Sequence, residues 1–442
     1  MARGEQNDVS RRDVVKMAGA TGLAGVAGVA GSASAQENPP IGNYPIQGDT
    51  ATFGFNVPQS GPYSSEGQDE LRAYELAVQH LNNGGGWVDN WEGLSGNGVL
   101  DYQLDSVTGD TATDADTARQ SARRMIQRDN AIMVSGGSSS AVAVAVQELC
   151  QREKVQFMAC LTHADDTTGG DCVRYSFREM FNTTMSAQAL APVVTEEYGD
   201  DLNFYQLYAD YNWGQSQQDS MNTYFSDAGW SQVESVATPL GTSDFSSYLS
   251  QVPRDETDVL FLNHYGLDGA NSLSQAIDRG LNEDMEIVVP LYNRPMAQAA
   301  SGAIEGVFGT VAWDAQIDNE PSNAFTETFQ NEYDRIPSGP AQLAYAQTLQ
   351  YAAAVERAGT FYPPEVIRQL EGHEYDNIGM GPETMRACDH QAQRAVPVVR
   401  GLPEGEQEEG SFFEIVNLTP REEIGYGCDE GPAAECELGP YE

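Results

Sequence analysis

Small polar residues follow two predicted β-strands, and their side chains could bind an anionic group. The first set is Gly136, Gly137, Ser138, Ser139 and Ser140, between an apolar strand at 131–134 and a helix beginning near 141. Glycines let the backbone approach a ligand, while hydroxyls and the free N–H groups of a helix N-terminus donate hydrogen bonds. These donors suit a carboxylate. The simpler alternative is that Ser138 or Ser139 only caps the helix.

A second group of side chains is placed in the same way. The strand predicted at 155–159 is followed by Thr162 and His163, which add a hydroxyl and an imidazole. Aromatic residues occupy the first loop and the ends of the later strands, where core aromatics are not expected. They are Tyr63, Tyr211, Trp213, Tyr265 and Tyr292, the last followed by Asn293. Together they would line an apolar pocket that contains a few polar groups.

The sequence lacks the usual catalytic motifs. It contains no G-x-S-x-G, Walker, G-x-G-x-x-G or H-E-x-x-H pattern, and its five histidines lie in unrelated segments. His163 with Asp165 and Asp166 fits no common metal-ligand spacing. We therefore expect binding without catalysis, metal or cofactor. The alternative, a hydrolase that uses Ser138, is disfavoured because serines at helix N-termini normally only bind.

The charge balance excludes several partners. The 442 residues carry 66 acidic and 23 basic side chains, a formal net charge of -43, and Lys16 and Lys154 are the two lysines. Such a polyanion does not bind nucleic acid or an anionic membrane through its general field. Because the acids are spread along the chain, we expect a protein that stays soluble at high salt, from an extreme halophile. An ordinary acidic secreted protein is the alternative.

The N-terminus is typical of an export signal. Arg11 and Arg12 precede a weakly apolar run at 17–31 and a small-residue cleavage pattern at 32–35. We predict a twin-arginine signal peptide at 1–35, a linker at 36–49, and a soluble mature chain at the cell surface, the equivalent of a periplasmic location. Six cysteines in an exported chain favour disulfides, although their pairing stays open.

Strands and helices alternate after residue 52, which predicts parallel sheets covered by helices on both faces. The main predicted strands are 52–57, 100–107, 131–134, 155–159, 204–208, 259–262 and 287–289; the main helices are 66–82, 114–129, 138–152, 187–198, 215–227, 270–279, 322–335 and 340–358. The fold class is therefore α/β, with two doubly wound lobes joined by several hinge crossings. We place lobe 1 at 50–178 plus 310–376 and lobe 2 at 179–309 plus 377–442.

These features together resemble a known family, the ABC-importer solute-binding proteins of the branched-chain amino-acid (Leu/Ile/Val) type, which have the type I periplasmic-binding fold. The resemblance covers nearly all of 50–420. It is carried by Ser60-Gly61-Pro62-Tyr63 with Gly67, Gly137-Ser138-Ser139-Ser140, Thr162, Tyr211-Asn212-Trp213-Gly214, Asp258-Val259-Leu260, Ala303-Ile304-Glu305-Gly306-Val307 and Arg386-Ala387-Cys388-Asp389-His390-Gln391.

The resemblance implies two lobes that close on a ligand. Ser138 or Ser139 and Thr162 would hold a carboxylate, Trp213 and Tyr265 would close from the second lobe, and Tyr63 would pack against the ligand side chain. Tyr292 and Asn293 complete the expected site.

One departure concerns the ligand's ammonium group. Amino-acid binders of this family usually carry an acid in the loop after the strand at 287–289, which here reads Tyr292-Asn293-Arg294. Asp210 or Asp268 could substitute for it. Otherwise the ligand lacks an ammonium, as an aromatic or aliphatic carboxylate, an amide or urea does.

We therefore expect an exported, monomeric, non-catalytic protein that binds a small carboxylate-bearing solute. A branched-chain or other amino acid is the expected ligand, and the membrane permease subunits of an ABC importer are the expected partners. The other ligand classes above are the alternative, as is a ligand-sensing receptor module without a transport role.

Overall fold

The computed structural model describes residues 38–407 and 411–442. The predicted signal peptide at 1–35 and the first two residues of the predicted linker lie outside the described residues.

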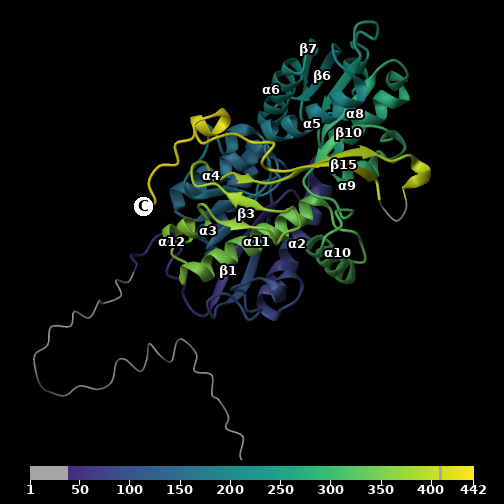
Figure 1. The fold of residues 1–442 in the computed structure, drawn as a ribbon. Helices are drawn as coiled ribbons and strands as arrows, with labels where there is room; N and C mark the ends of the chain where they lie inside the picture. The colour runs from purple at the N-terminus through teal and green to yellow at the C-terminus, as the bar shows by residue number, and fades with distance from the viewer. Residues whose placement is uncertain (1–37, 408–410) are drawn as a thin grey trace, which may run out of the picture. The chain divides into compact units, whose positions relative to one another are not determined.

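The first sheet contains five parallel strands in the order β2-β1-β3-β4-β5 (Figure 1). These strands are β1 Thr50–Val57, β2 Gln103–Asp110, β3 Met133–Gly136, β4 Gln156–Ala159 and β5 Ser176–Arg178. The strand order reverses at β1, so the connecting helices cover both faces of the sheet. α2 (Ser64–Asn83) packs with α11 (Gly339–Ala358), and α3 (Ala115–Gln127) packs with α4 (Ser140–Glu153).

The second sheet contains seven strands in the order β15-β14-β10-β9-β8-β6-β7. They are β6 Asn203–Ala209, β7 Ser231–Thr238, β8 Val259–Asn263, β9 Glu286–Tyr292, β10 Phe308–Val311, β14 Val396–Gly401 and β15 Phe413–Thr419. Five of these strands run parallel, while β14 is antiparallel to both β10 and β15. The packed helix pairs are α5 (Thr183–Tyr198) with α6 (Asn212–Asp227), and α8 (Gly266–Asp278) with α9 (Arg294–Ala299).

The chain passes three times between the two sheets: after β5, after β10, and between β13 (Ala392–Gln393) and β14. β13 belongs to a small antiparallel sheet with β11 (Glu374–Tyr375) and β12 (Glu383–Met385). Two further helices, α10 (Glu320–Tyr333) and α12 (Pro363–Leu370), lie on either side of α11 in the sequence. The prediction of an α/β fold with two lobes and several crossings is confirmed. The exact residue boundaries of the lobes stay a prediction.

The start of α2 shows why particular residues are needed there. Gly61 has a φ of 84°, in the left-handed region that favours glycine. A Cβ on Gly67 would lie 1.9 Å from the carbonyl oxygen of Pro58, so a side chain at that position cannot be accommodated. The turn after β1 is thereby pressed against the first turns of α2, which fixes Tyr63 and Glu66.

Three apolar clusters hold the layers together. One lies between α3, α4 and the first sheet and includes Ala122, Val146 and Phe157. Another lies in the second sheet with α8 and α9. The largest runs from α2 and α11 through α5 and α6, so residues of both sheets share one continuous core. Burial of this area is the main favourable term in folding.

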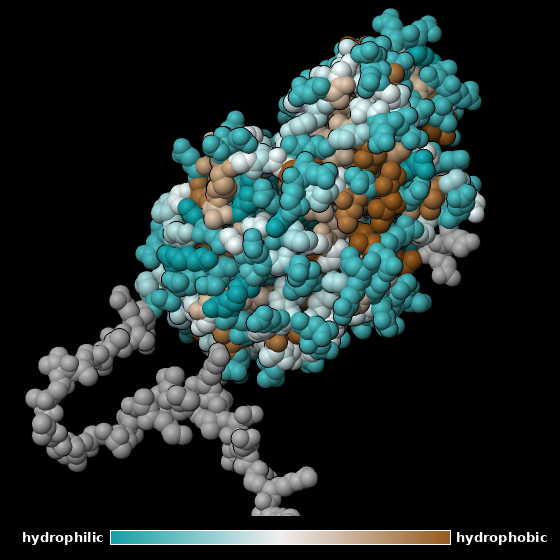
Figure 2. Space-filling model, in the orientation of Figure 1, coloured by the Kyte–Doolittle hydropathy of each residue, from teal (hydrophilic) through white to brown (hydrophobic). Residues whose placement is uncertain are grey.

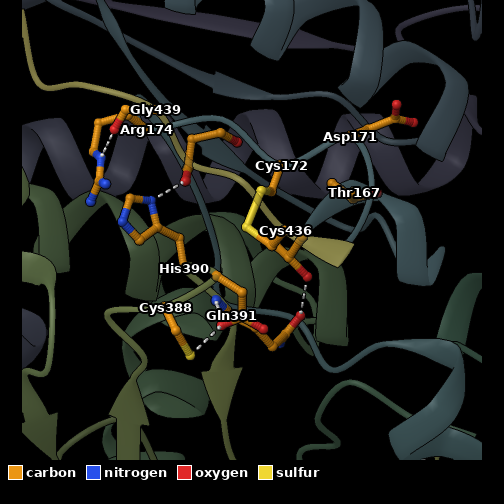
Figure 3. The surroundings of a disulfide bond; sticks show 12 residues. Thr167, Asp171, Cys172, Arg174, Cys388, His390, Gln391, Cys436 and Gly439 are labelled. Carbon is orange, nitrogen blue, oxygen red and sulfur yellow. Dashed lines mark hydrogen bonds between the residues drawn. A yellow bond between two sulfur atoms is a disulfide. The ribbon is translucent and has the colours of Figure 1, made fainter. Parts of the chain in front are cut away.

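Two disulfides fasten the C-terminal segment. Cys172 is bonded to Cys436 and Cys388 to Cys428, whereas Cys150 and Cys160 are buried and free. Figure 3 shows the surroundings of the first bond, where Arg174 Nε donates to the carbonyl of Gly439 at 3.0 Å. The even cysteine count correctly predicted disulfides, and the pairing links segments that are distant in the sequence.

The face drawn in Figure 2 is mostly hydrophilic, with apolar atoms gathered over the region where β15 runs. β15 carries two of the large apolar side chains that are more than a third exposed, Val416 (41%) and Leu418 (39%). In the described part of the chain, no helix is long and apolar enough to cross a membrane.

Candidate functional site

The turn between β3 and α4 carries the three predicted serines, all of them buried. A Cβ on Gly136, whose φ is 122°, would lie 2.2 Å from the carbonyl oxygen of Asn56, so the backbone there requires glycine. Ser139 is the N-cap of α4, yet its side chain makes no capping hydrogen bond. Its hydroxyl has no hydrogen-bond partner among the described residues. Ser139 therefore does not serve as a cap and is available to a ligand.

The other two serines already have partners. Ser138 Oγ donates to Glu70 Oε1 on α2. Ser140 Oγ accepts hydrogen bonds from Thr162 Oγ1 and from the backbone N–H of Ala164, both at 3.1 Å. Thr162 is thus held beside the start of α4, as predicted, but its hydroxyl is engaged with Ser140. The expected carboxylate cradle retains one unpartnered hydroxyl, that of Ser139.

Two glutamates one helical turn apart on α2, Glu66 and Glu70, face this region, and neither was among the site residues predicted from the sequence. Glu66 is 1% exposed and Glu70 is 0% exposed. Glu66 Oε1 accepts from Asn293 Nδ2 at 2.9 Å, which joins α2 to the end of β9. The second oxygen of each carboxylate has no hydrogen-bond partner among the described residues. The carboxyl group of Glu70 also lies close to the thiol of Cys160, and this contact lowers the pKa of Glu70.

Burial and mutual repulsion make these carboxylates unusually weak acids. Removal from water raises the pKa of Glu66 to about 7, although the bond from Asn293 opposes the rise. Burial raises the pKa of Glu70 to about 8, opposed by the bond from Ser138 and increased by the charge of Glu66. Near neutral pH both groups are close to their midpoints, so a ligand's charge can decide whether they hold protons.

Aromatic rings from both sheets meet next to the glutamates. The ring of Tyr265, at the start of α8, lies 5.5 Å from that of Tyr63, 6.1 Å from that of Trp213 and 6.5 Å from that of His163, measured between centroids. The hydroxyls of Tyr63 and Tyr211 are 2.6 Å apart. Trp213 Nε1 has no hydrogen-bond partner in the described structure.

Burial raises the pKa of Tyr265 well above its usual value, and the charges of Glu66 and Glu70 add to the rise. Tyr63 is also the N-cap residue of α2, three residues before Glu66, and its ring contacts that of Tyr265, so the aromatic group adjoins the carboxylates. We call Tyr63, Glu66, Glu70, Ser139, His163, Trp213 and Tyr265 the interlobe cluster.

His163 contributes an uncharged ring to this cluster. Its pKa is lowered well below the ordinary value by burial and by the charge of Arg178. The ring packs 5.3 Å from that of Phe181. Asp165, which the sequence places near His163, instead accepts hydrogen bonds from Thr184. Within the described residues, no three His, Cys, Asp or Glu side chains are placed to hold a metal ion.

The last two predicted site residues, Tyr292 and Asn293, lie in different surroundings. Asn293 joins the site through Glu66, and its side-chain oxygen also caps α9 by accepting from the N–H of Met296 at 2.7 Å. Tyr292 packs into the core of the second sheet, with its ring 5.2 Å from that of Phe413. Because successive strand residues point to opposite faces, Asn293 and Tyr292 cannot both face the cluster.

Each aspartate suggested as an ammonium ligand already accepts a hydrogen bond from the protein. Asp210 is exposed and accepts from Gln215 Nε2 at 3.1 Å. Asp268 is buried near Tyr63 and Tyr211, but its Oδ2 accepts from the backbone N–H of Gly241 at 2.7 Å. The glutamates of α2 are the acids that the structure brings to the cluster. Their i, i+4 spacing on the stripe that also buries Ala73 and Ala77 was the signal available in the sequence.

A separate cavity of about 420 Å³ opens elsewhere, between the loop after β4, the helix α6 and the C-terminal segment. Asp166, Asp219 and Glu435 are among the residues that line it, and it includes no member of the interlobe cluster. The cluster, which combines residues of both sheets with unpartnered polar atoms, is the better candidate.

Comparisons with known proteins identify the family and the fold. A family model for periplasmic binding proteins matches residues 50–406. A Leu/Ile/Val-binding protein homolog from Brucella abortus is 27% identical over 236 residues, which are 52% of this chain and 55% of the relative. The chain thus spans about half the length of this relative.

Two solved structures show the same fold. A periplasmic binding protein from Burkholderia mallei has a TM-score of 0.79 and 23% identity, covering 88% of this chain and 100% of that one. A solute-binding protein of an ABC transporter from Rhodopseudomonas palustris, in complex with 3,4-dihydroxybenzoic acid, has a TM-score of 0.73 and 18% identity, covering 84% of this chain and 97% of that one.

Proposed function

The chain belongs to the periplasmic binding protein family, and from this premise we propose that it is the exported solute-binding protein of an ABC importer. It captures an amino acid between its two lobes and delivers it to membrane permease subunits. The twin-arginine signal predicted at 1–35 would direct the folded chain out of the cell.

The observation that carries this proposal is the composition of the interlobe cluster. Tyr63, Glu66 and Ser139 come from elements of the first sheet, and Trp213 and Tyr265 from elements of the second. Three of their polar atoms, Glu66 Oε2, Ser139 Oγ and Trp213 Nε1, have no hydrogen-bond partner among the described residues. Leaving buried polar atoms unpaired costs about 1–3 kcal/mol each, which a polar ligand would recover.

A ligand that contacts both lobes favours the closed arrangement, because that arrangement alone supplies all the contacts. The closed shape is then what the permease recognises. The cluster offers donors at Ser139 and the start of α4 for a carboxylate, acceptors on α2 for an ammonium, and rings for an apolar side chain. An amino acid has these three parts.

Thermal unfolding with candidate ligands in molar salt tests the proposal. An amino acid at 100 times its Kd should stabilise the protein by about 2.7 kcal/mol. Benzoate-like acids, amides and urea serve as the competing ligand classes, since the solved relative from Rhodopseudomonas palustris is in complex with a dihydroxybenzoic acid. If these compounds stabilise the protein and amino acids do not, the ligand is not an amino acid.

Variants connect the ligand to the cluster. Ser139→Ala should weaken binding of an amino acid, while Ser231→Ala, at the exposed start of β7, should not. Small-angle scattering should show a more compact particle with ligand than without it. Equal compactness in both states would contradict closure on the ligand.

A further inference from the structure

The interlobe cluster contains two buried acidic side chains, which a site for a simple anion would not need. Glu66 and Glu70 are fully buried, each keeps one oxygen without a partner, and no ion pair in the described part of the chain involves either. Only Ser139 among the three neighbouring serines keeps a free hydroxyl. The other unpartnered polar atoms of the cluster, such as Trp213 Nε1 and the Tyr265 hydroxyl, belong to neutral groups, so Glu66 and Glu70 are its unpartnered acidic side chains.

The rings beside the carboxylates suit a cation as well. The ring centroid of Tyr265 lies 5.5 Å from that of Tyr63 and 6.1 Å from that of Trp213. The face of an aromatic ring attracts a positive charge, most strongly when both are removed from water. Buried carboxylates and aromatic faces together are the surroundings that stabilise an organic ammonium group.

We infer that Glu66 and Glu70 hold the cationic end of the ligand, an ammonium group, beside the ring of Tyr265. The inference rests on the proposed function and names the chemical group that the site selects. Amines and amino acids bind, whereas carboxylic acids of the same shape without an ammonium are rejected. The acid missing from the loop after β9 is thereby replaced by acids of α2, of which Glu66 accepts a hydrogen bond from Asn293 in that loop.

The competing ligand class, an aromatic or aliphatic carboxylate, meets a physical obstacle here. Its negative charge would lie near two buried carboxyl groups and would repel their ionised forms, so its binding would favour the protonated forms. An ammonium has the opposite effect and favours the ionised carboxylates. The two ligand classes therefore differ in the sign of the proton exchange that accompanies binding.

Matched probes separate the two classes. Leucine is compared with 3-methylbutylamine, which lacks the carboxylate, and with 4-methylpentanoate, which lacks the ammonium. Phenylalanine, phenethylamine and 3-phenylpropanoate form a second series. Isothermal calorimetry at pH 7 in molar salt should show at least one amine binding, with the matched acid weaker by at least about ten-fold, which corresponds to 1.4 kcal/mol.

Variants on α2 provide the second measurement. Glu66→Gln and Glu70→Gln should each weaken amine binding by at least about ten-fold, with folding checked by circular dichroism. Glu75→Gln is the matched control, because Glu75 is exposed on the same helix and loses the same charge. Calorimetry in buffers with different ionisation enthalpies should show proton release when an amine binds, and this release should shrink in both glutamine variants.

The outcomes are distinct. Acids that bind as tightly as the matched amines would overturn the inference and leave the proposed function intact. Folded glutamine variants that bind an amine as well as the wild type would overturn it too. If none of the six probes binds, the proposed capture of an amino acid fails, and the inference fails with it.

Discussion

Asn293 donates its side-chain amide to Glu66 at 2.9 Å, so the residue that caps α9 beside the second sheet also holds a buried carboxylate on α2 beside the first. One side chain thus performs a local structural task and forms a direct link between the lobes. The same hydrogen bond lowers the cost of burying Glu66, because it stabilises the ionised form.

Replacing Asn293 should therefore cost more than the loss of a cap. Asn293→Ala removes a helix cap, worth about 1 kcal/mol, and also leaves Glu66 Oε1 without its donor. Urea unfolding at pH 8 should show a destabilisation of more than about 1.5 kcal/mol. Asn319→Ala is the comparison, since Asn319 caps α10 and donates its amide to the backbone carbonyl of Gly379, a neutral acceptor, instead of to a carboxylate. Equal destabilisation of the two variants would contradict the second role of Asn293.

Stability should depend on pH through the glutamates of α2. Their folded pKa values, about 7 and about 8, lie above the ordinary value of 4.5, so the native state binds more protons than the unfolded state between these values. The free energy of unfolding therefore falls as pH rises through this window.

The titratable groups that face the pair include Asp69 and Tyr74 of α2, and Tyr63, Cys160 and Tyr265 from other elements; none is a cation. In the double variant Glu66→Gln/Glu70→Gln, the free energy of unfolding should fall less steeply with pH. Its decrease between pH 5 and 9 should be smaller than that of the wild type by more than about 1 kcal/mol. Parallel stability curves for wild type and variant would disagree with this expectation.

The hydroxyl pair of Tyr63 and Tyr211 should favour the closed lobes. Tyr211→Phe removes one partner of a 2.6 Å hydrogen bond that joins elements of the two sheets, at a cost of about 1 kcal/mol. Scattering should then show a less compact particle without ligand, and ligand affinity should fall.

Tyr292→Phe is a useful contrast because the hydroxyl of Tyr292 is buried without a hydrogen-bond partner in the described structure. Its removal should leave ligand affinity unchanged and should not lower the melting temperature. A loss of affinity in this variant would return Tyr292 to the site.

The two disulfides predict a definite pattern of thiol reactivity. Cys172, Cys388, Cys428 and Cys436 should be oxidised, while Cys150 and Cys160 should react with a thiol reagent only after unfolding. Cys172→Ser/Cys436→Ser should destabilise the protein by about 2–5 kcal/mol.

Cys150→Ala is the control for this cross-link, because it removes a buried sulfur without breaking a bond between segments, and it should cost only about 1 kcal/mol. Non-reducing peptide mapping that recovers a different pairing would contradict the assignment.

Much of the fold followed from the pattern of apolar residues. The strands at 204–208 and 259–262 and the helix at 340–358 were predicted within about two residues of β6, β8 and α11. The strand predicted at 100–107 was placed less accurately, because Leu100 and Asp101 have positive φ angles and form a turn before β2 begins at Gln103. A local turn of this kind leaves no periodic signal.

The site was only partly predictable. Glycines, serines and aromatic residues at strand ends indicated Ser139, Trp213 and Tyr265; all three are buried and the last two are in ring contact, while their role as ligand contacts stays a prediction. Glu66 and Glu70 were missed because acidic residues in the first turns of a helix usually face water and the helix dipole. Only the packing of α2 against the turn of Ser138 and against Asn293 shows that they are buried. Such long-range contacts cannot be read from local spacing.

The fastening of the C-terminal segment has a mechanical consequence. β15 ends at Thr419, and Cys428 is held by Cys388 near the crossings between the sheets. The intervening stretch of about nine peptide units spans at most about 30 Å when fully extended. Swinging the edge of the seven-stranded sheet farther than this from Cys388 would require a sulfur–sulfur bond to break, so covalent chemistry sets a ceiling on the opening angle of the molecule.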